Sequence, residues 1–173
     1  RRGWIARRAR QMASALEKRG VEPGQRVATF AWNTYRHLEL YFAVPCAGRV
    51  LHTLNIRLFP DQIAYIVNHA EDQVIFVDES LVPVLEKMTP AFKTVKLYVI
   101  MSDGPMPQTT LSPAVDYEAL LQEGDPDYAF PPLDEYEGAM MCYTSGTTGN
   151  PKGVVHTHST LLDRASAGAE FDK

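Results

Sequence analysis

Ten positions near the C-terminal end of the sequence, Thr144 to Gly153, combine residue types that can bind an anion, and they are called the glycine–hydroxyl loop below. Its glycines leave backbone N–H groups accessible, Ser145, Thr147 and Thr148 add hydroxyl donors, and Lys152 adds a positive charge. Such groups can together surround a phosphate without a metal cage. Phosphate binding is therefore the first chemistry that the sequence indicates.

The glycine–hydroxyl loop differs from the P-loop of NTPases, which has the pattern GxxxxGK[ST] and opens a helix whose N-terminus meets the phosphate. Counted from Gly146, the second glycine position holds Pro151, and the residue after the lysine is Gly153 rather than Ser or Thr. Apolar residues 140–143 precede the loop and the β-branched residues 154–155 follow it, which predicts a loop that joins two strands. We expect hydroxyls and loop amides, and not a helix dipole, to bind the anion.

Lys152 is isolated from the other cations of the chain. Residues 97–151 contain nine Asp or Glu and no Lys or Arg, so Lys152 is the first cation after Lys96. A single lysine placed after an acidic stretch, inside this loop, favours a ligand role over that of an ordinary exposed loop lysine.

The hydrophobic pattern of the rest of the chain predicts the elements that must position this loop. Apolar stripes, caps and prolines indicate helices over about residues 5–19, 35–44, 60–70 and 81–88, and from about residue 160 to the end. Apolar runs indicate strands at residues 27–30, 50–53, 73–77, 95–101 and 154–156. This β-α-β alternation predicts an α/β fold with a doubly wound, mostly parallel sheet flanked by helices. Ligands of such sheets bind beyond the carboxyl ends of the strands.

Residues 102–138 differ from this pattern because they are rich in proline and acids. We interpret them as a solvated surface connection with one short helix near Tyr117 to Leu121. The acids of residues 116–137 lack an apolar framework that would raise a pKa, so they are not interpreted as catalytic carboxylates.

The histidines give weaker signals than the loop. His156 and His158 are two residues apart and would share one face of a strand, but no further zinc ligands cluster near them. His37, His52 and His69 fall in predicted helices or at strand ends and are interpreted as structural residues.

Composition describes an ordinary globular chain of 173 residues, with 45% hydrophobic and 22% charged residues and a net charge of −4. No run of about 18 apolar residues suggests a transmembrane segment. The basic N-terminal stretch is expected to be the solvated face of a helix and not a nucleic-acid site. Cys46 and Cys142 are expected to be free thiols, which fits a cytoplasmic location.

The residues also resemble a known family. Residues 143–155, YTSGTTGNPKGVV, followed by His158, closely resemble the signature of the adenylate-forming (AMP-binding) enzymes, which include acyl-CoA synthetases, adenylation domains and luciferases. Residues 31–45, 51–58 and 63–70 are similar to the medium- and long-chain fatty acyl-CoA synthetase branch. The likeness covers nearly the whole chain, and the loop motif is its most specific part.

The resemblance implies a two-step reaction in which ATP activates a fatty acid or related carboxylate and coenzyme A then takes the acyl group. It implies nucleotide contacts for Thr144, Ser145, Gly146, Thr147, Thr148, Gly149 and Lys152. It further implies a role in catalysis for Lys152 and for His158, which would lie near the acyl substrate and adenylate, and Mg²⁺ near Thr144. A homodimer is among the assemblies that it allows for the complete enzyme.

Family members are several hundred residues longer, so residues 1–173 are expected to be a single incomplete domain, part of the large N-terminal AMP-binding domain, with the C-terminal domain absent. We expect the isolated chain to be inactive and poorly stable, because a sheet cut beside its next strand leaves an unpaired edge. Two alternatives stay open. One is an aryl-CoA ligase or a peptide-synthetase adenylation domain, and the other is a non-catalytic phosphate-binding module.

Overall fold

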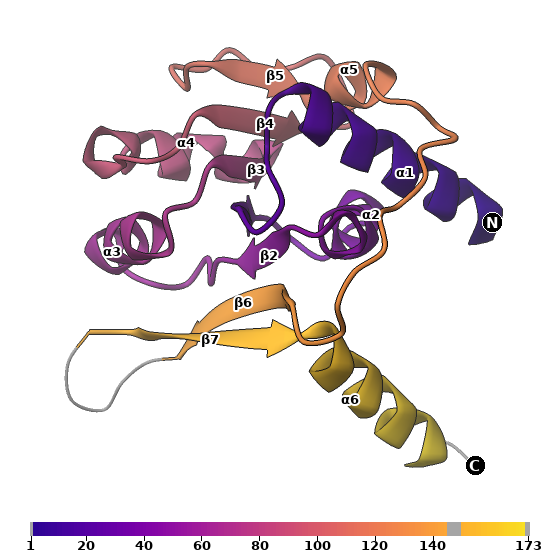
Figure 1. The fold of residues 1–173 in the computed structure, drawn as a ribbon. Coiled ribbons are helices and arrows are strands. Elements are labelled where there is room, and N and C mark those ends of the chain that lie inside the picture. The colour runs from indigo at the N-terminus through magenta and orange to yellow at the C-terminus, as the bar shows by residue number, and fades with distance from the viewer. Residues whose placement is uncertain (1, 145–149, 172–173) are drawn as a thin grey trace.

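The strands of the fold form one central sheet (Figure 1). A computed structural model describes residues 2–144 and 150–171, and over these residues the strands are β1 (Arg26–Phe30), β2 (Val50–Thr53), β3 (Val74–Asp78), β4 (Leu97–Met101), β5 (Ala114–Asp116), β6 (Gly138–Thr144) and β7 (Lys152–Thr157). Their order is β5-β4-β3-β1-β2-β6-β7. Every neighbouring pair is parallel except β6 and β7, which are antiparallel. The predicted doubly wound, mostly parallel sheet is confirmed.

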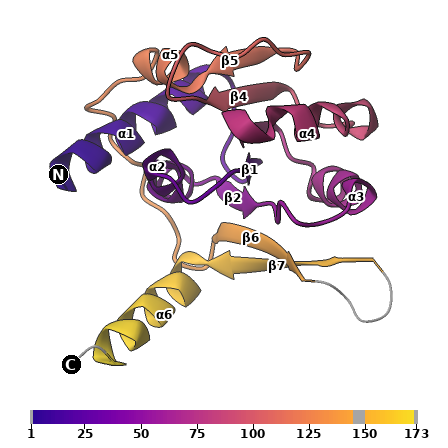
Figure 2. The same ribbon diagram turned by 180° about the vertical axis from the view of Figure 1, so that it is seen from behind.

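Helices cover both faces of this sheet, as the views from the front and from behind show (Figures 1 and 2). They are α1 (Arg2–Lys18), α2 (Tyr35–Ala43), α3 (Pro60–Ala70), α4 (Val82–Glu86), α5 (Tyr117–Gln122) and α6 (His158–Phe171), with short 3-10 turns at Pro45–Ala47, Glu79–Leu81 and Thr89–Ala91. Among the described residues, no helix combines the length and apolar character that crossing a bilayer requires.

Alternation along the strands divides the core into two layers. In β3, Val74 and Phe76 pack on the side of α1, α2 and α5, whereas Ile75 and Val77 pack on the side of α3 and α4. Successive side chains of a strand point to opposite faces, so a parallel strand that is covered on both faces is apolar throughout. This is why the continuous apolar runs in the sequence were sufficient to predict these strands.

Local signals set several helix ends where the sequence predicts them. The Thr34 hydroxyl accepts a hydrogen bond from the backbone N–H of His37 at the start of α2. Pro60 occupies the first turn of α3, where its missing N–H costs nothing. α2 and α3, which begin at these residues, pack on opposite faces of the sheet.

The prediction for residues 102–138 is partly wrong. This segment adds β5 to the sheet, where β5 pairs with β4, and it buries Tyr117, Leu120 and Leu121 of α5. The Tyr117 hydroxyl donates to the buried carboxylate of Glu39, 2.7 Å away, and Arg8 donates to the same carboxylate. A segment whose composition predicts a solvated connection is thus attached to the core through the short strand β5 and the short helix α5.

The start of the last helix also differs from the prediction. α6 begins at His158 and not near Thr160, so His158 is helical and does not share a strand face with His156. The residue that caps this helix is Thr157, whose hydroxyl oxygen lies 3.2 Å from the backbone N of Thr160. β7 and α6 lie at the edge of the sheet farthest from β5 (Figure 1).

Candidate functional site

The β6–β7 pair brings the two ends of the glycine–hydroxyl loop together. Thr144, the last residue of β6, lies opposite Lys152, the first residue of β7, and Tyr143 lies opposite Gly153. The predicted connection between two strands is therefore confirmed, although Ser145, Gly146, Thr147, Thr148 and Gly149 lie outside the described residues. Since β6 is parallel to β2, the loop follows the carboxyl end of a parallel strand, where α/β sheets bind ligands.

Thr144 and Lys152 are exposed and share one face of the strand pair, because directly opposed residues of an antiparallel pair point to the same side. Tyr143 and Gly153 point to the other face. The arrangement places a hydroxyl and an ammonium group side by side at the mouth of the loop. These are two of the donor types that a phosphate group accepts.

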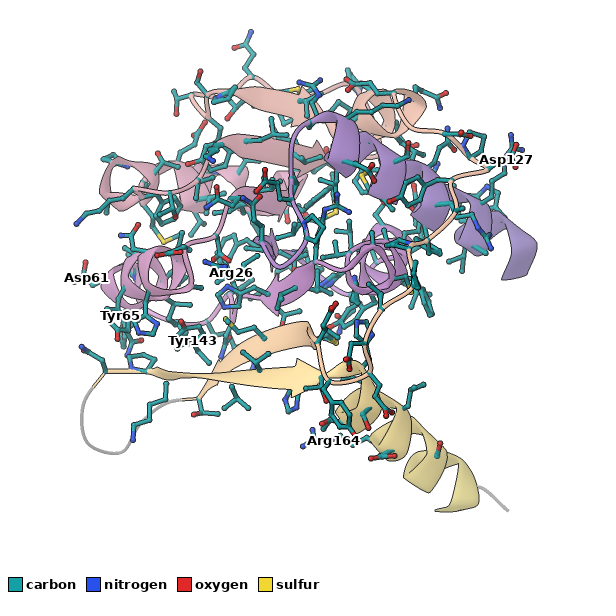
Figure 3. All side chains as sticks on the ribbon, in the orientation of Figure 1. Arg26, Asp61, Tyr65, Asp127, Tyr143 and Arg164 are labelled. Atoms are coloured by element: carbon teal, nitrogen blue, oxygen red, sulfur yellow. The ribbon has the colours of Figure 1, made fainter. Side chains whose placement is uncertain are left out.

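Tyr143 packs between α3 and the β6–β7 pair, beside Tyr65 of α3 (Figure 3). Its hydroxyl lies 2.7 Å from Nδ1 of His69, and the His69 ring stacks on Tyr65 with 5.3 Å between centroids. On the other side, a Cβ added to Gly153 would lie only 3.1 Å from Cζ of Tyr143, so the ring covers the glycine closely. Burial raises the pKa of Tyr143 above that of an ordinary tyrosine.

A buried pair of His52 and Asp72 lies next to the Tyr143 ring. Nδ1 of His52 is 2.9 Å from both carboxylate oxygens of Asp72, and both side chains are fully buried. Burial raises the pKa of Asp72, and the hydrogen bond from His52 opposes this shift. The His52 and Tyr143 rings lie 5.3 Å apart between centroids.

The structure places His158 at the first position of α6, where its backbone N–H donates to the carbonyl oxygen of Glu137 at 3.3 Å. Its Nε2 is buried and has no hydrogen-bond partner in the part of the chain that the structure describes. His156 lies on β7 with its Nε2 4.0 Å from Sγ of Cys142. Within residues 2–144 and 150–171, no group of three His, Cys, Asp or Glu side chains could bind a metal ion.

Sequence reasoning did not single out the contact between Tyr143 and His69 beside the loop. The spacing of Tyr65 and His69 by four residues could have indicated their stacking on one helix face. The contact between His69 and Tyr143 joins residues 74 positions apart, and nothing in the local sequence indicates it. His37, His52 and His69 are all engaged in hydrogen bonds, as their structural interpretation expects.

The chain is an α/β domain in which the connection from β6 to β7 lies at the carboxyl edge of a mostly parallel sheet. The sequence pattern of the family described as "AMP-binding enzyme" matches residues 5–172, so this chain belongs to that family.

Curated relatives are CoA ligases of several kinds. A medium-chain-fatty-acid–CoA ligase from Ectopseudomonas oleovorans is 48% identical over 157 residues, which cover 90% of this chain and 29% of that protein. A 3-methylmercaptopropionyl-CoA ligase from Ruegeria lacuscaerulensis is 46% identical, over 92% of this chain and 30% of that protein. A long-chain-fatty-acid–CoA ligase from Thermus thermophilus is 45% identical, over 97% of this chain and 30% of that protein. The chain thus spans less than a third of the length of these relatives.

Solved structures share the fold. An anthranilate CoA ligase in complex with anthranoyl-AMP superposes with a TM-score of 0.81 at 22% identity, over 89% of this chain and 29% of that one. The inhibitor-bound N-terminal domain of FACL13 from Mycobacterium tuberculosis gives a TM-score of 0.76 at 25% identity, over 96% of this chain and 39% of that one. The sheet order and flanking helices are thus those of the N-terminal domain of adenylate-forming enzymes.

Proposed function

We propose that this chain supplies the phosphate-binding loop of an AMP-forming acid–thiol ligase that acts on a fatty acid. The observation that supports this most directly is the pairing of Thr144 with Lys152, exposed on one face at the carboxyl edge of the sheet, in a member of the AMP-binding enzyme family. The names of the relatives support CoA-ligase chemistry, and two of the three relatives described above are named for fatty acids.

In the proposed reaction, a carboxylate oxygen attacks the α-phosphorus of ATP, and the bond to the bridging oxygen breaks to release pyrophosphate. The sulfur of coenzyme A then attacks the acyl carbon of the acyl-adenylate, and AMP leaves. Negative charge grows on the departing pyrophosphate in the first step. Donors that are already in place stabilise that charge at little reorganisation cost.

Each candidate residue has a role in this scheme. Lys152 supplies the positive charge, and Thr144 with Ser145, Gly146, Thr147, Thr148 and Gly149 supplies hydroxyl and amide donors to the β- and γ-phosphates. His158 is proposed to contact the acyl substrate and adenylate. Its Nε2 is buried and has no hydrogen-bond partner among the described residues, which is consistent with a polar contact to a ligand.

Magnesium fits this site as an ion bound mostly by the nucleotide. Thr144 offers a hydroxyl oxygen, a ligand type that Mg²⁺ accepts alongside phosphate oxygens and water. The ion would neutralise charge on the phosphates when bound. ATP, Mg²⁺ and coenzyme A are thus the proposed small-molecule partners, and we propose that the complete activity requires the further length that the relatives have.

The test uses the protein expressed from the full reading frame that encodes these residues, called the full-length product below. Lys152→Ala should slow adenylation, measured as fatty-acid-dependent ATP–pyrophosphate exchange, by about 100-fold to 1,000-fold, the range for losing one electrostatic donor. Thioester formation from supplied acyl-adenylate should change far less. Lys87→Ala is the matched control, because Lys87 is also exposed but directly follows α4 and is remote from the loop.

Equal losses in both half-reactions would contradict the role of Lys152. The proposal of a non-catalytic phosphate-binding module predicts a different outcome: the full-length product would bind ATP or pyrophosphate but show no exchange with any acid. Replacing the fatty acid by benzoate or an amino acid in the same exchange assay separates the aryl-CoA ligase and peptide-synthetase alternatives.

A further inference from the structure

Tyr143 occupies a position next to the proposed phosphate site from which it cannot itself bind the ligand. It directly precedes Thr144, but its side chain points to the face of β6 opposite to that of Thr144 and Lys152. An effect of Tyr143 on ligand binding must therefore pass through the strand backbone.

Three contacts fix the Tyr143 ring on that face. The hydroxyl meets Nδ1 of His69 at 2.7 Å, the His69 ring meets the phenol ring edge-on at 5.9 Å between centroids, and the His52 ring lies 5.3 Å away. Gly153 closes the remaining side, since a Cβ there would fall within 3.3 Å of both Cε2 and the hydroxyl oxygen of Tyr143. The ring thus spans the strand pair and α3.

The neighbours of Tyr143 are themselves held by the core. His52 donates to the buried carboxylate of Asp72, and the backbone of Asp72 accepts from the Thr94 hydroxyl at 2.9 Å. His69 belongs to α3, whose Ile66 and Val67 are buried against the sheet. Tyr143 therefore connects the end of β6 to α3 through the exposed side chain of His69.

Simple core packing would account for the ring but not for the hydroxyl. Phenylalanine fills the same space, whereas only tyrosine can hydrogen-bond His69. We propose that the Tyr143–His69 hydrogen bond positions the paired ends of the glycine–hydroxyl loop, Thr144 and Lys152, for nucleotide binding. Tyr143 and His69 are then positioning residues for the loop, and this inference rests on the proposed function of that loop.

The test compares Tyr143→Phe, which removes only the hydroxyl, with Tyr128→Phe in the full-length product. Tyr128 is the matched control because its hydroxyl also donates to a side chain, that of Glu17, far from the loop. We expect Tyr143→Phe to raise KM for ATP in the exchange assay about twofold to fivefold, the lower part of the range for losing one hydrogen bond, because water can reach this exposed pair. Tyr128→Phe should leave KM unchanged, and neither variant should slow thioester formation from supplied acyl-adenylate.

Variants of His69 separate positioning from a general loss of stability. His69→Ala should raise KM for ATP as Tyr143→Phe does, and His69→Asn, whose side-chain oxygen lies close to the place of Nδ1, should restore most of the loss. The double variant should be no worse than either single variant, because both remove the same hydrogen bond. Calorimetric titration with ATP measures the same ranking as dissociation constants without depending on turnover.

The inference is overturned if Tyr143→Phe and Tyr128→Phe have the same KM, if the two half-reactions slow equally, or if the effects of Tyr143→Phe and His69→Ala add. Lys152→Ala distinguishes this failure from that of the proposed function. If Lys152→Ala abolishes exchange while Tyr143→Phe has no effect, the loop function stands and only the positioning role is rejected. If Lys152→Ala has no effect, the proposed function itself is rejected, and the inference with it.

Discussion

Replacing Glu39 should destabilise the fold more than replacing any exposed acid of the chain. Glu39 is fully buried on α2, where its carboxylate accepts from Nε of Arg8 and from the Tyr117 hydroxyl, each at 2.7 Å. It thereby joins α1, α2 and α5 on one face of the sheet. Burial by itself lowers the pKa of Arg8, but hydrogen bonds to Glu118 and Glu39 outweigh that effect and raise it.

The size of the effect follows from which groups lose a partner. Glu39→Leu leaves the Tyr117 hydroxyl buried without an acceptor, while Arg8 keeps its two hydrogen bonds to Glu118. We therefore expect a cost of about 2–4 kcal/mol, the sum of about 1–3 kcal/mol for an unsatisfied buried hydroxyl and about 1 kcal/mol for the hydrogen bond that Arg8 loses. Glu39→Gln keeps the shape and loses only the charge, and a cost of about 1.5–3 kcal/mol is expected. Glu123→Gln disrupts another Arg–Glu pair, with Arg19, in which both side chains are about two-fifths exposed. Its cost should be below about 1 kcal/mol.

Urea unfolding of the full-length product, followed by circular dichroism and tryptophan fluorescence, measures this ranking. The slope of the unfolding free energy against urea should stay constant among variants, so that shifts in midpoint report stability. A cost for Glu39→Leu within about 1 kcal/mol of that for Glu123→Gln would refute the reasoning, because burial would then add nothing to the value of the pair.

Two further predictions concern the pH dependence of stability and the packing of α5 on α1. Burial lowers the pKa of His37 from 6.5, so below about pH 6.5 the unfolded chain binds a proton that the folded chain does not. The free energy of unfolding should therefore decrease as the pH is lowered, by up to about 1.4 kcal/mol per pH unit. His37→Gln should remove this dependence in urea titrations between about pH 7.5 and pH 5.5, and an unchanged slope would count against it. Gly124→Ala should cost more than about 2 kcal/mol, since its Cβ would fall 1.8 Å from the backbone oxygen of Gln11. Gly104→Ala, with nothing within 4 Å, should be neutral. Urea unfolding measures both variants, and equal losses would show that the close approach at Gly124 is relieved cheaply.

Most elements of the sheet could be predicted from the sequence because their signals are local. The strand predicted at residues 50–53 matches β2 at both ends, and the helices predicted from residues 35 and 60 begin at Tyr35 and Pro60. Buried parallel strands are apolar on both faces, so they are recognisable without knowledge of their partners. The same holds for the loop between β6 and β7, whose flanking residues are apolar or β-branched.

The missed features depend on partners distant in sequence. β5 has only three residues and follows a proline-rich stretch, so its pairing with β4 could not be read from a pattern of period two. The burial of Glu39 requires Arg8 and Tyr117 from two other helices. Likewise, the contact between Tyr143 and His69 forms only because α3 places His69 within reach. Local patterns predict elements, whereas polar contacts between elements require the tertiary fold.

The close fit of Tyr143 over Gly153 also restricts how β7 can align with β6. Sliding β7 by one residue in either direction would put Lys152 or Val154 opposite Tyr143 in place of the glycine. Either side chain would then occupy the space that the phenol ring fills, where even a methyl group lies 3.1 Å from Cζ. Such a slip would also turn the Lys152 ammonium away from the face of Thr144, because side chains alternate along a strand. The contact between Gly153 and the Tyr143 ring therefore disfavours any misaligned pairing of β6 and β7 that would separate Thr144 from Lys152.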